Sequence, residues 1–188
     1  MLKNFMPFPV LKTERLILRQ IEADDAAVVF DLRTNKTVNK FLLRTSPETI
    51  ENVLRTIEKL NQGISAGNNI YWVLNLENDR KVIGTICLWN LDAEKSVGEI
   101  GYEIHPDFQG KGLMREAVKR VLKYGFEEMK LEKIEAWTNT ANSASIRLLE
   151  RNNFVRNLEA ETAIDREKEG EDTVIYVLEK ETFYSNGK

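Results

Sequence analysis

The sequence is poor in the residue types that bind metals and form disulfides. It holds one cysteine, Cys87, and one histidine, His105, among 188 residues. This set cannot form an internal disulfide, a multi-cysteine zinc or iron–sulfur site, or a histidine-rich metal centre. We therefore expect no metal cofactor, and one unpaired cysteine fits a reducing, cytoplasmic location.

Long apolar runs and an excess of basic charge are also missing. No stretch approaches the roughly 20 apolar residues that cross a bilayer, and the early residues lack the unbroken apolar stretch of a signal peptide. Lys and Arg number 27 against 30 Asp and Glu, a net charge of −3. That balance does not favour broad nucleic-acid binding. We expect neither a membrane nor a nucleic-acid partner.

What the chain does have is a globular composition, with 42% hydrophobic and 30% charged residues. A chain of this length can bury its own core, and we expect one domain over residues 1–188. Hydrophobic periodicity and turn signals predict strands at 15–19, 70–76, 81–91, 97–104, 133–138, 154–158 and 173–178. They predict a helix over 113–129 and further helices capped by Asp24-Asp25, by Ser46 and by Asn142 or Ser143. The order predicts a mixed α/β domain with early antiparallel hairpins and one strand–helix–strand unit.

An acidic run stands out at 159–172, with seven acidic and two basic residues. Such a run is typical of a solvated loop or hairpin tip. The alternative is an acidic rim that attracts a cationic substrate.

The stretch 99–117 carries the strongest chemical signal. It reads as a strand, a loop with Gly110 and Gly112, and the start of a long amphipathic helix. The first amides of a helix have no partner within it, and together with the helix dipole they form an anion site that suits a phosphate. Lys111 and Arg115 can add positive charge. Neither the P-loop pattern nor the full dinucleotide fingerprint is present.

The sequence of this loop resembles a motif of a known protein family. The residues Gln109-Gly-Lys-Gly-Leu-Met114 resemble the pyrophosphate loop of the GNAT superfamily of N-acetyltransferases, (Arg or Gln)-x-x-Gly-x-(Gly or Ala). Gln109 and Gly112 match, whereas Met114 replaces the usual small residue.

Two further segments resemble the same family. Residues 142–154 resemble its Asn-x-x-Ser…Gly-Phe segment, with Asn153 in place of the glycine. Residues 13–19, Thr-Glu-Arg-Leu-Ile-Leu-Arg, resemble the first strand of the RimJ/RimL-like branch, which acetylates ribosomal-protein N-termini. The three segments occur in order over residues 13–154.

The resemblance implies a mostly antiparallel twisted sheet that splits like a V near Ile104, with helices on both faces. It implies that acetyl-CoA lies in the split, with its pantetheine arm on the strand edge. The implied contacts with the acetyl-CoA are Ile104, Gln109, Gly110, Lys111, Gly112, Leu113, Met114, Arg115 and Asn142.

The implied reaction is attack of a neutral amine on a thioester, which calls for a group that accepts a proton. Glu99 and Glu103 lie four residues apart on one predicted strand and so share a face. Either carboxylate is a candidate base, with Glu99 favoured, and each could equally be a solvated strand residue. His105 is a third candidate.

The leaving thiolate needs a proton, and the resemblance places Ser145 to donate it. A backbone N–H near Ile104 would stabilise the oxyanion. Cys87 lies in an apolar strand, where cysteine is usually inert. We therefore expect direct transfer in a ternary complex.

The sequence contains few signals for the acceptor pocket. Phe41, Trp72 and Trp89 are candidate walls, although strand aromatics are more often core. The acceptor suggested by the resemblance is the N-terminal amine of a ribosomal protein. A small amine (polyamine, amino sugar or antibiotic) and a non-catalytic acyl-CoA-binding module are the alternatives, and the residues leave open whether the chain forms a homodimer.

Overall fold

The computed structural model describes residues 4–79 and 81–185. The strands are β1 (Leu11–Lys12), β2 (Leu16–Gln20), β3 (Ile70–Leu76), β4 (Val82–Asp92), β5 (Val97–Ile104), β6 (Lys133–Asn139), β7 (Val155–Arg156) and β8 (Thr173–Glu179). The α-helices are α1 (Ala26–Thr34), α2 (Lys36–Asn39), α3 (Ile50–Ser65), α4 (Leu113–Glu127), α5 (Ser143–Glu150), α6 (Leu158–Glu161), α7 (Arg166–Glu169) and α8 (Lys180–Ser185), with 3-10 turns η1 (Ala23–Asp25) and η2 (Pro106–Phe108).

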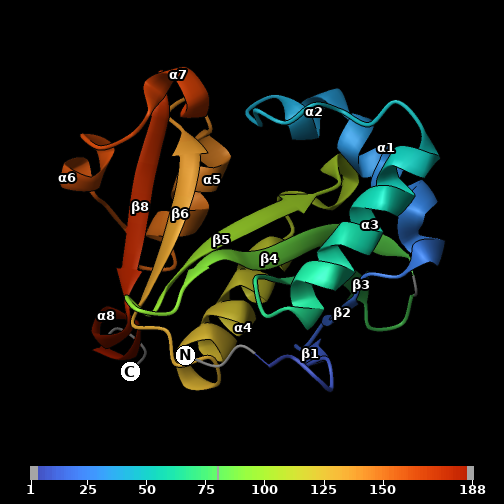
Figure 1. Ribbon diagram of the computed structural model, residues 1–188, viewed down its shortest axis with the longest axis horizontal. Coiled ribbons are helices and arrows are strands. Elements are labelled where there is room, and N and C mark those ends of the chain that lie inside the picture. Colours follow the sequence, from blue (N-terminus) through green and yellow to red (C-terminus); the bar gives the residue numbers. More distant parts are fainter. Residues whose placement is uncertain (1–3, 80, 186–188) are drawn as a thin grey trace.

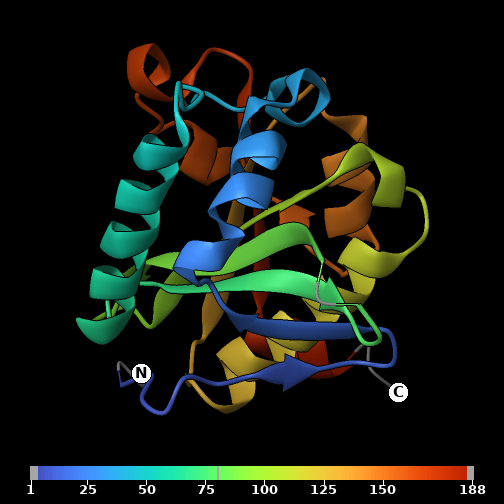
Figure 2. The same cartoon turned by 90° about the vertical axis from the view of Figure 1, so that its right-hand side faces the viewer.

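The strands form one eight-stranded sheet in the order β1-β2-β3-β4-β5-β6-β8-β7. Neighbouring strands run antiparallel except β5 and β6, which are parallel and joined through α4. Helices α1 and α3 cover one face of the sheet, and α4 covers the other (Figures 1 and 2). The predicted mixed, mostly antiparallel α/β fold is confirmed.

The sheet opens between β5 and β6. These strands pair at three positions only, Val97 with Lys133, Gly98 with Ile134 and Glu99 with Glu135. Beyond Glu99 the two strands continue but diverge, as Figure 1 shows. The V-shaped split therefore has its narrow end at Glu99 and its wide end at Ile104.

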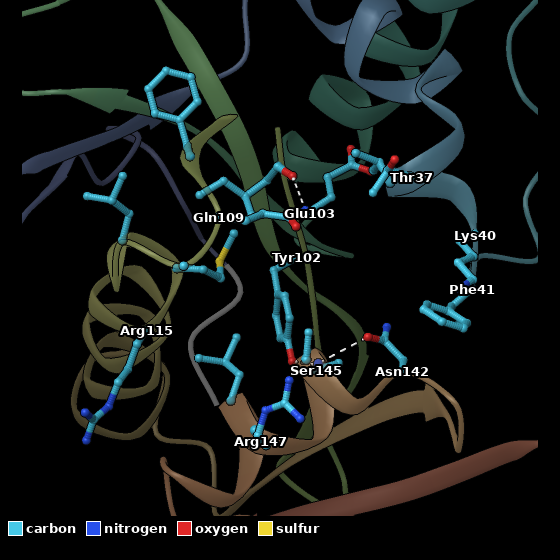
Figure 3. Close-up of a pocket in the computed structure, with 18 of the residues that line it drawn as sticks. Thr37, Lys40, Phe41, Tyr102, Glu103, Gln109, Arg115, Asn142, Ser145 and Arg147 are labelled. Carbon is cyan, nitrogen blue, oxygen red and sulfur yellow. Dashed lines mark hydrogen bonds between the residues drawn. The ribbon is translucent and has the colours of Figure 1, made fainter. Parts of the chain in front are cut away.

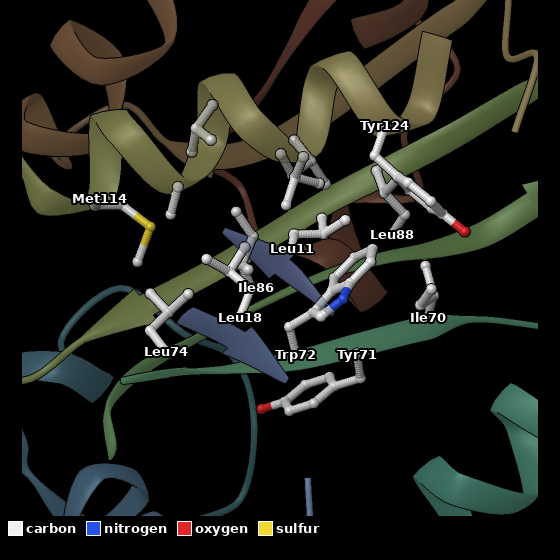
Figure 4. Packing of buried hydrophobic residues seen from close by; sticks show 14 of the residues in the cluster. Leu11, Leu18, Ile70, Tyr71, Trp72, Leu74, Ile86, Leu88, Met114 and Tyr124 are labelled. Atoms are coloured by element: carbon white, nitrogen blue, oxygen red, sulfur yellow. The ribbon is translucent and has the colours of Figure 1, made fainter. Parts of the chain in front are cut away.

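The main core lies between the sheet and α4. The apolar face predicted for 113–129 is buried throughout, although the helix itself ends at Glu127: Leu113, Ala117, Val121, Leu122, Phe126 and Met129 are each at most 5% exposed. The strand side chains that meet α4 include Leu18, Leu74, Ile86 and Leu88 (Figure 4). This packing fixes the start of α4 relative to the end of β5, which positions the loop between them.

Trp72 belongs to this core, so its prediction as an acceptor wall is wrong. Its side chain is 0% exposed and packs edge-on against Phe8 and Tyr124, with ring centroids 6.0 and 5.6 Å away. The indole N–H donates to the Pro9 carbonyl at 2.8 Å. Alternation along β3 explains the error, because Trp72 faces α4 whereas its neighbour Tyr71 faces α1 (Figure 4).

The helix predicted after Ser46 begins three residues later. Thr49 is the N-cap of α3, and its hydroxyl accepts from the Asn52 amide at 3.3 Å. The Asn52 side chain accepts in return from the Thr49 amide at 3.0 Å. This reciprocal cap satisfies two of the first amides, which a cap at Ser46 would not do.

The acidic run 159–172 contains two short helices, α6 and α7, instead of a simple hairpin tip. Glu161 is 8% exposed and pairs with Arg156 at 2.8 Å. Within residues 4–79 and 81–185, no helix has the length and apolar character needed to cross a membrane.

Candidate functional site

A cleft of about 640 Å³ lies at the wide end of the split. The N-terminus of α4 and helix α5 form one side, and residues 37–42 form the other (Figure 3). The predicted site residues that line it are Phe41, Glu103, Ile104, Gln109, Gly110, Gly112, Leu113, Met114, Arg115, Asn142 and Ser145. Segments far apart in sequence therefore meet around one cavity.

The loop before α4 leaves its first amides free of side-chain caps. Gly112 is the N-cap, and because glycine has no side chain it cannot cap the first amides of the helix. The backbone φ is +72° at Gly110 and +77° at Gly112, a left-handed conformation that other residues rarely adopt. A Cβ at Gly110 would meet nothing within 4 Å, so backbone conformation, and not crowding by protein atoms, explains this glycine.

Arg15 holds this loop in place. Its Nη1 donates to the Lys111 carbonyl at 3.0 Å, and its Nε donates to Glu116 Oε2 at 2.7 Å. The Arg15 amide also donates to Glu116 Oε1 at 2.9 Å. The start of β2 is thereby tied to the first turn of α4.

Positive charge surrounds the uncapped helix start. Arg115 lines the cleft from α4, and Arg147 and Arg151 line it from the α5 side. Lys111, although predicted to contact the acetyl-CoA, does not line the cleft, and its ammonium lies 5.3 Å from the centroid of the Phe108 ring. The free amides at the start of α4 and these three guanidinium groups could together bind an anion.

Asn142 and Ser145 lie at the start of α5. Asn142 is the N-cap, and its side-chain oxygen accepts from the Ser145 amide at 3.2 Å (Figure 3). The Ser145 hydroxyl lies 2.9 Å from the Tyr102 hydroxyl, and either group can donate. Burial raises the pKa of Tyr102 to about 12, so it keeps its proton at neutral pH.

Glu99 lies at the narrow end of the split and does not line the cleft itself. Burial raises its pKa to about 7, with Glu135 and Glu169 adding to the rise. The Asn90 side chain donates to Glu99 Oε2 at 2.9 Å and opposes that rise. Asn90 has a φ of +46° where the β4–β5 register shifts, which turns its amide toward Glu99.

Glu103 has quite different surroundings. It is 8% exposed, and its Oε2 lies 2.6 Å from Arg44 Nη2. Its Oε1 lies 3.8 Å from Arg33 Nε and accepts from the Thr85 hydroxyl at 3.2 Å. The carboxylate is thus occupied by three partners.

Trp89 does not fit the predicted role of acceptor wall, because it lies outside the cleft and is 44% exposed. It stands opposite Glu99 on the neighbouring strand. Of the three predicted walls, only Phe41 lines the cleft.

The remaining reactive candidates have other surroundings. His105 is the N-cap of η2, and its Nδ1 accepts from the Asp107 amide at 3.3 Å. Burial raises the pKa of Cys87 to about 12, and its Sγ lies 3.6 Å from the Gly101 carbonyl. A thiol with that pKa is a poor nucleophile at neutral pH.

Sequence reasoning missed Tyr102 and Arg44. Strand alternation could have identified Tyr102, because it places this residue on the opposite face of β5 from Glu99 and Glu103. In the structure that face meets α5 at Ser145. Arg44 carried no local signal, because its partner is 59 residues away in sequence on β5.

The comparisons with known proteins agree with this architecture. The family described as acetyltransferase (GNAT) domain matches residues 15–155. The uncharacterized N-acetyltransferase YoaA of Bacillus subtilis (strain 168) is 35% identical over 142 residues, which cover 76% of this chain and 80% of YoaA.

Two solved structures share the fold at lower identity. Spermidine N-acetyltransferase from Vibrio cholerae, in complex with CoA and spermine, has a TM-score of 0.76 at 22% identity and covers 92% of this chain and 99% of that one. The ribosomal L7/L12 alpha-N-protein acetyltransferase RimL, in complex with coenzyme A, has a TM-score of 0.79 at 15% identity and covers 91% of this chain and 98% of that one. At these identities the likeness is one of fold.

Proposed function

This chain belongs to the GNAT family and is an acetyltransferase, and from that premise we propose that it moves an acetyl group from acetyl-CoA to the N-terminal amine of a protein, by direct attack in a ternary complex. The observation that carries the proposal is the uncapped, glycine-led start of α4, which shares one cleft with the Tyr102–Ser145 pair.

Acetyl-CoA fits this cleft by charge and by shape. Its pyrophosphate would accept from the amides that follow Gly112, and Arg115, Arg147 and Arg151 would add opposite charge. Its pantetheine arm would lie in the split beside β5, near Ile104 and Asn142. Because the strands converge toward Glu99, this path directs the thioester to the narrow end.

Glu99 is the proposed base. A base works best with a pKa near the working pH, and the pKa of Glu99 is about 7. It would accept the proton of the attacking amine, directly or through water. Glu103 is the weaker candidate, because its carboxylate already forms ion pairs with Arg44 and Arg33 and accepts from the Thr85 hydroxyl.

Ser145 and Tyr102 together are the proposed acid. As the carbon–sulfur bond breaks, the Ser145 hydroxyl would give its proton to the leaving thiolate. Tyr102, which is protonated beforehand, would pass its own proton to Ser145 and regain one from water. Backbone amides at the free edge of β5 would stabilise the oxyanion.

Two observations support a protein N-terminus as the acceptor. Residues 13–19 resemble the branch that acetylates ribosomal proteins, and RimL shares the fold. A polyamine is the second candidate, because the spermidine acetyltransferase also shares the fold.

Release of CoA thiol, measured with acetyl-CoA and a panel of amines, tests the proposal. The panel needs peptides with ribosomal-protein N-termini, the same peptides blocked at the N-terminus, and spermidine. Turnover with the free peptides alone is expected. Turnover with spermidine alone would favour the small-amine candidate, and acetyl-CoA binding without turnover would favour a non-catalytic module.

A further inference from the structure

A buried cluster of Arg33, Arg44 and Glu103, hereafter the Glu103 cluster, lies at one wall of the cleft, which Glu103 itself lines. The three residues come from α1, from the loop between α2 and α3, and from β5. Arg44 Nη2 lies 2.6 Å and Arg33 Nε 3.8 Å from the two Glu103 oxygens. The Glu103 side chain is 6% exposed, against 17% for Arg33 and 27% for Arg44.

Burial makes this cluster sensitive to the loss of one member. A buried charge that loses its partner is strongly destabilised, whereas an exposed pair contributes little. Arg33 is further fixed, since its Nη2 donates to the Tyr71 hydroxyl at 3.2 Å. Arg33 and Glu103 are therefore rigid parts of the scaffold, and Arg44 is the member contributed by a loop.

Arg44 connects the segment 35–49 to the sheet. Its Nε donates to the Asn39 side-chain oxygen at 3.0 Å, and the Asn39 side chain donates to the Arg33 carbonyl. Apolar burial provides little anchorage, because Leu42 is 38% and Leu43 73% exposed. Across the described ranges 4–79 and 81–185, Arg44–Glu103 is the ion pair that joins this segment to a strand.

The same segment forms the cleft wall that faces α5. Thr37, Lys40, Phe41 and Leu42 line the cleft from this side, and Lys40 and Phe41 stand across it from Arg115 in Figure 3. Under the proposed function, acetyl-CoA occupies the opposite side, at α4 and α5. The wall that segment 35–49 forms is then the side of the cleft available to contact the acceptor.

We propose that Arg44 is a positioning residue for the acceptor: by pairing with Glu103 it holds segment 35–49 as the acceptor wall. This inference rests on the proposed acetyl transfer. Loss of Arg44 then weakens acceptor binding and leaves acetyl-CoA binding unchanged. Arg15 holds the loop before α4 in place, so its loss weakens acetyl-CoA binding and leaves acceptor binding unchanged.

The test compares Arg44→Gln, Arg44→Lys and Glu103→Gln with the matched control Arg15→Gln. Arg44→Gln and Glu103→Gln are expected to raise the KM for the acceptor about tenfold or more, with KM for acetyl-CoA within about twofold of wild type. Arg44→Lys keeps the charge and is expected to recover most of the loss. Arg15→Gln is expected to raise the KM for acetyl-CoA instead.

Hydrogen exchange of residues 36–48 supplies a readout independent of turnover. Arg44→Gln is expected to speed exchange there and to leave α4 unchanged. Equal rises in both KM values, no rise in either, or unchanged exchange would overturn the inference, and thermal unfolding identifies a variant that has lost its fold. Absence of transfer to any amine would overturn the proposed function, while exchange would still decide whether Arg44 holds the segment.

Discussion

The Tyr102 hydroxyl lies 2.9 Å from the Ser145 hydroxyl, and this pair joins β5 to the start of α5 inside the cleft. A serine alone is a weak acid. A second hydroxyl within hydrogen-bond distance can return a proton as the first gives one away. In the proposed reaction, Tyr102 therefore replaces the proton that Ser145 gives to the thiolate.

Removal of either hydroxyl should slow the chemical step. We expect Ser145→Ala to lower kcat about 10²-fold and Tyr102→Phe to lower it less, with the KM for acetyl-CoA nearly unchanged. The double variant should lose little more than Ser145→Ala, because the two groups act in one path. Steady-state kinetics of the four proteins checks this, and additive losses would contradict a shared path.

Glu99 should control the acidic limb of the pH profile. Its carboxyl accepts a proton only when ionised, and its pKa is about 7. The ionised fraction, and with it kcat, therefore falls as pH drops below 7. Glu99→Gln should lower kcat and remove this limb, whereas Glu103→Gln should keep it.

Asn90 offers a finer check on the same group. Its amide donates to Glu99 and so stabilises the carboxylate. Asn90→Ala removes that donor, raises the pKa of Glu99 and should move the limb to higher pH. A limb that stays in place in kcat profiles from pH 5 to 9 would show that Glu99 is not the group that titrates.

Gly112 should be needed for acetyl-CoA binding. Gly112→Asp strains a residue with a φ of +77° and places a negative charge beside the proposed phosphates. We expect the Kd for acetyl-CoA to rise at least about tenfold, a change of about 1.4 kcal/mol. Gly112→Ala adds the strain without the charge and is expected to have a smaller effect in calorimetry.

Trp72 should affect stability and not acceptor choice. It is fully buried between β3 and α4. Trp72→Ala is expected to lower the free energy of unfolding by about 3–5 kcal/mol, as measured by urea denaturation. A changed ranking of acceptors at a temperature where the variant is folded would place Trp72 in the site after all.

The fold and the acetyl-CoA side of the cleft were predictable because their signals are local. The strands 70–76 and 97–104 were predicted at their observed bounds, since turn residues at 78–79 follow the first run of β-formers and His105-Pro106 ends the second. The apolar face of α4 follows from its helical spacing. Its glycine loop is likewise contiguous in sequence.

The acceptor side was not predictable in the same way. In our proposal the wall on this side depends on the ion pair between Arg44 and Glu103. These residues are far apart in the sequence, and no local sequence pattern predicts that they meet. Trp72 and Trp89 are both strand aromatics, and sequence does not tell which face of a sheet an isolated tryptophan occupies. The start of α3 was predicted at Ser46, whereas Thr49 caps the helix, because N-cap preference favours serine over threonine and does not register the reciprocal bond with Asn52.

The proposed acetyl transfer requires that the first amides of α4 hold the diphosphate of acetyl-CoA. The most direct measurement is a titration of the ¹⁵N-labelled protein with acetyl-CoA, with the amide resonances followed by NMR. The largest changes in chemical shift are expected at the amides of residues 112–115, at the start of α4. Binding that leaves these amides unmoved, or no binding at all, would contradict it.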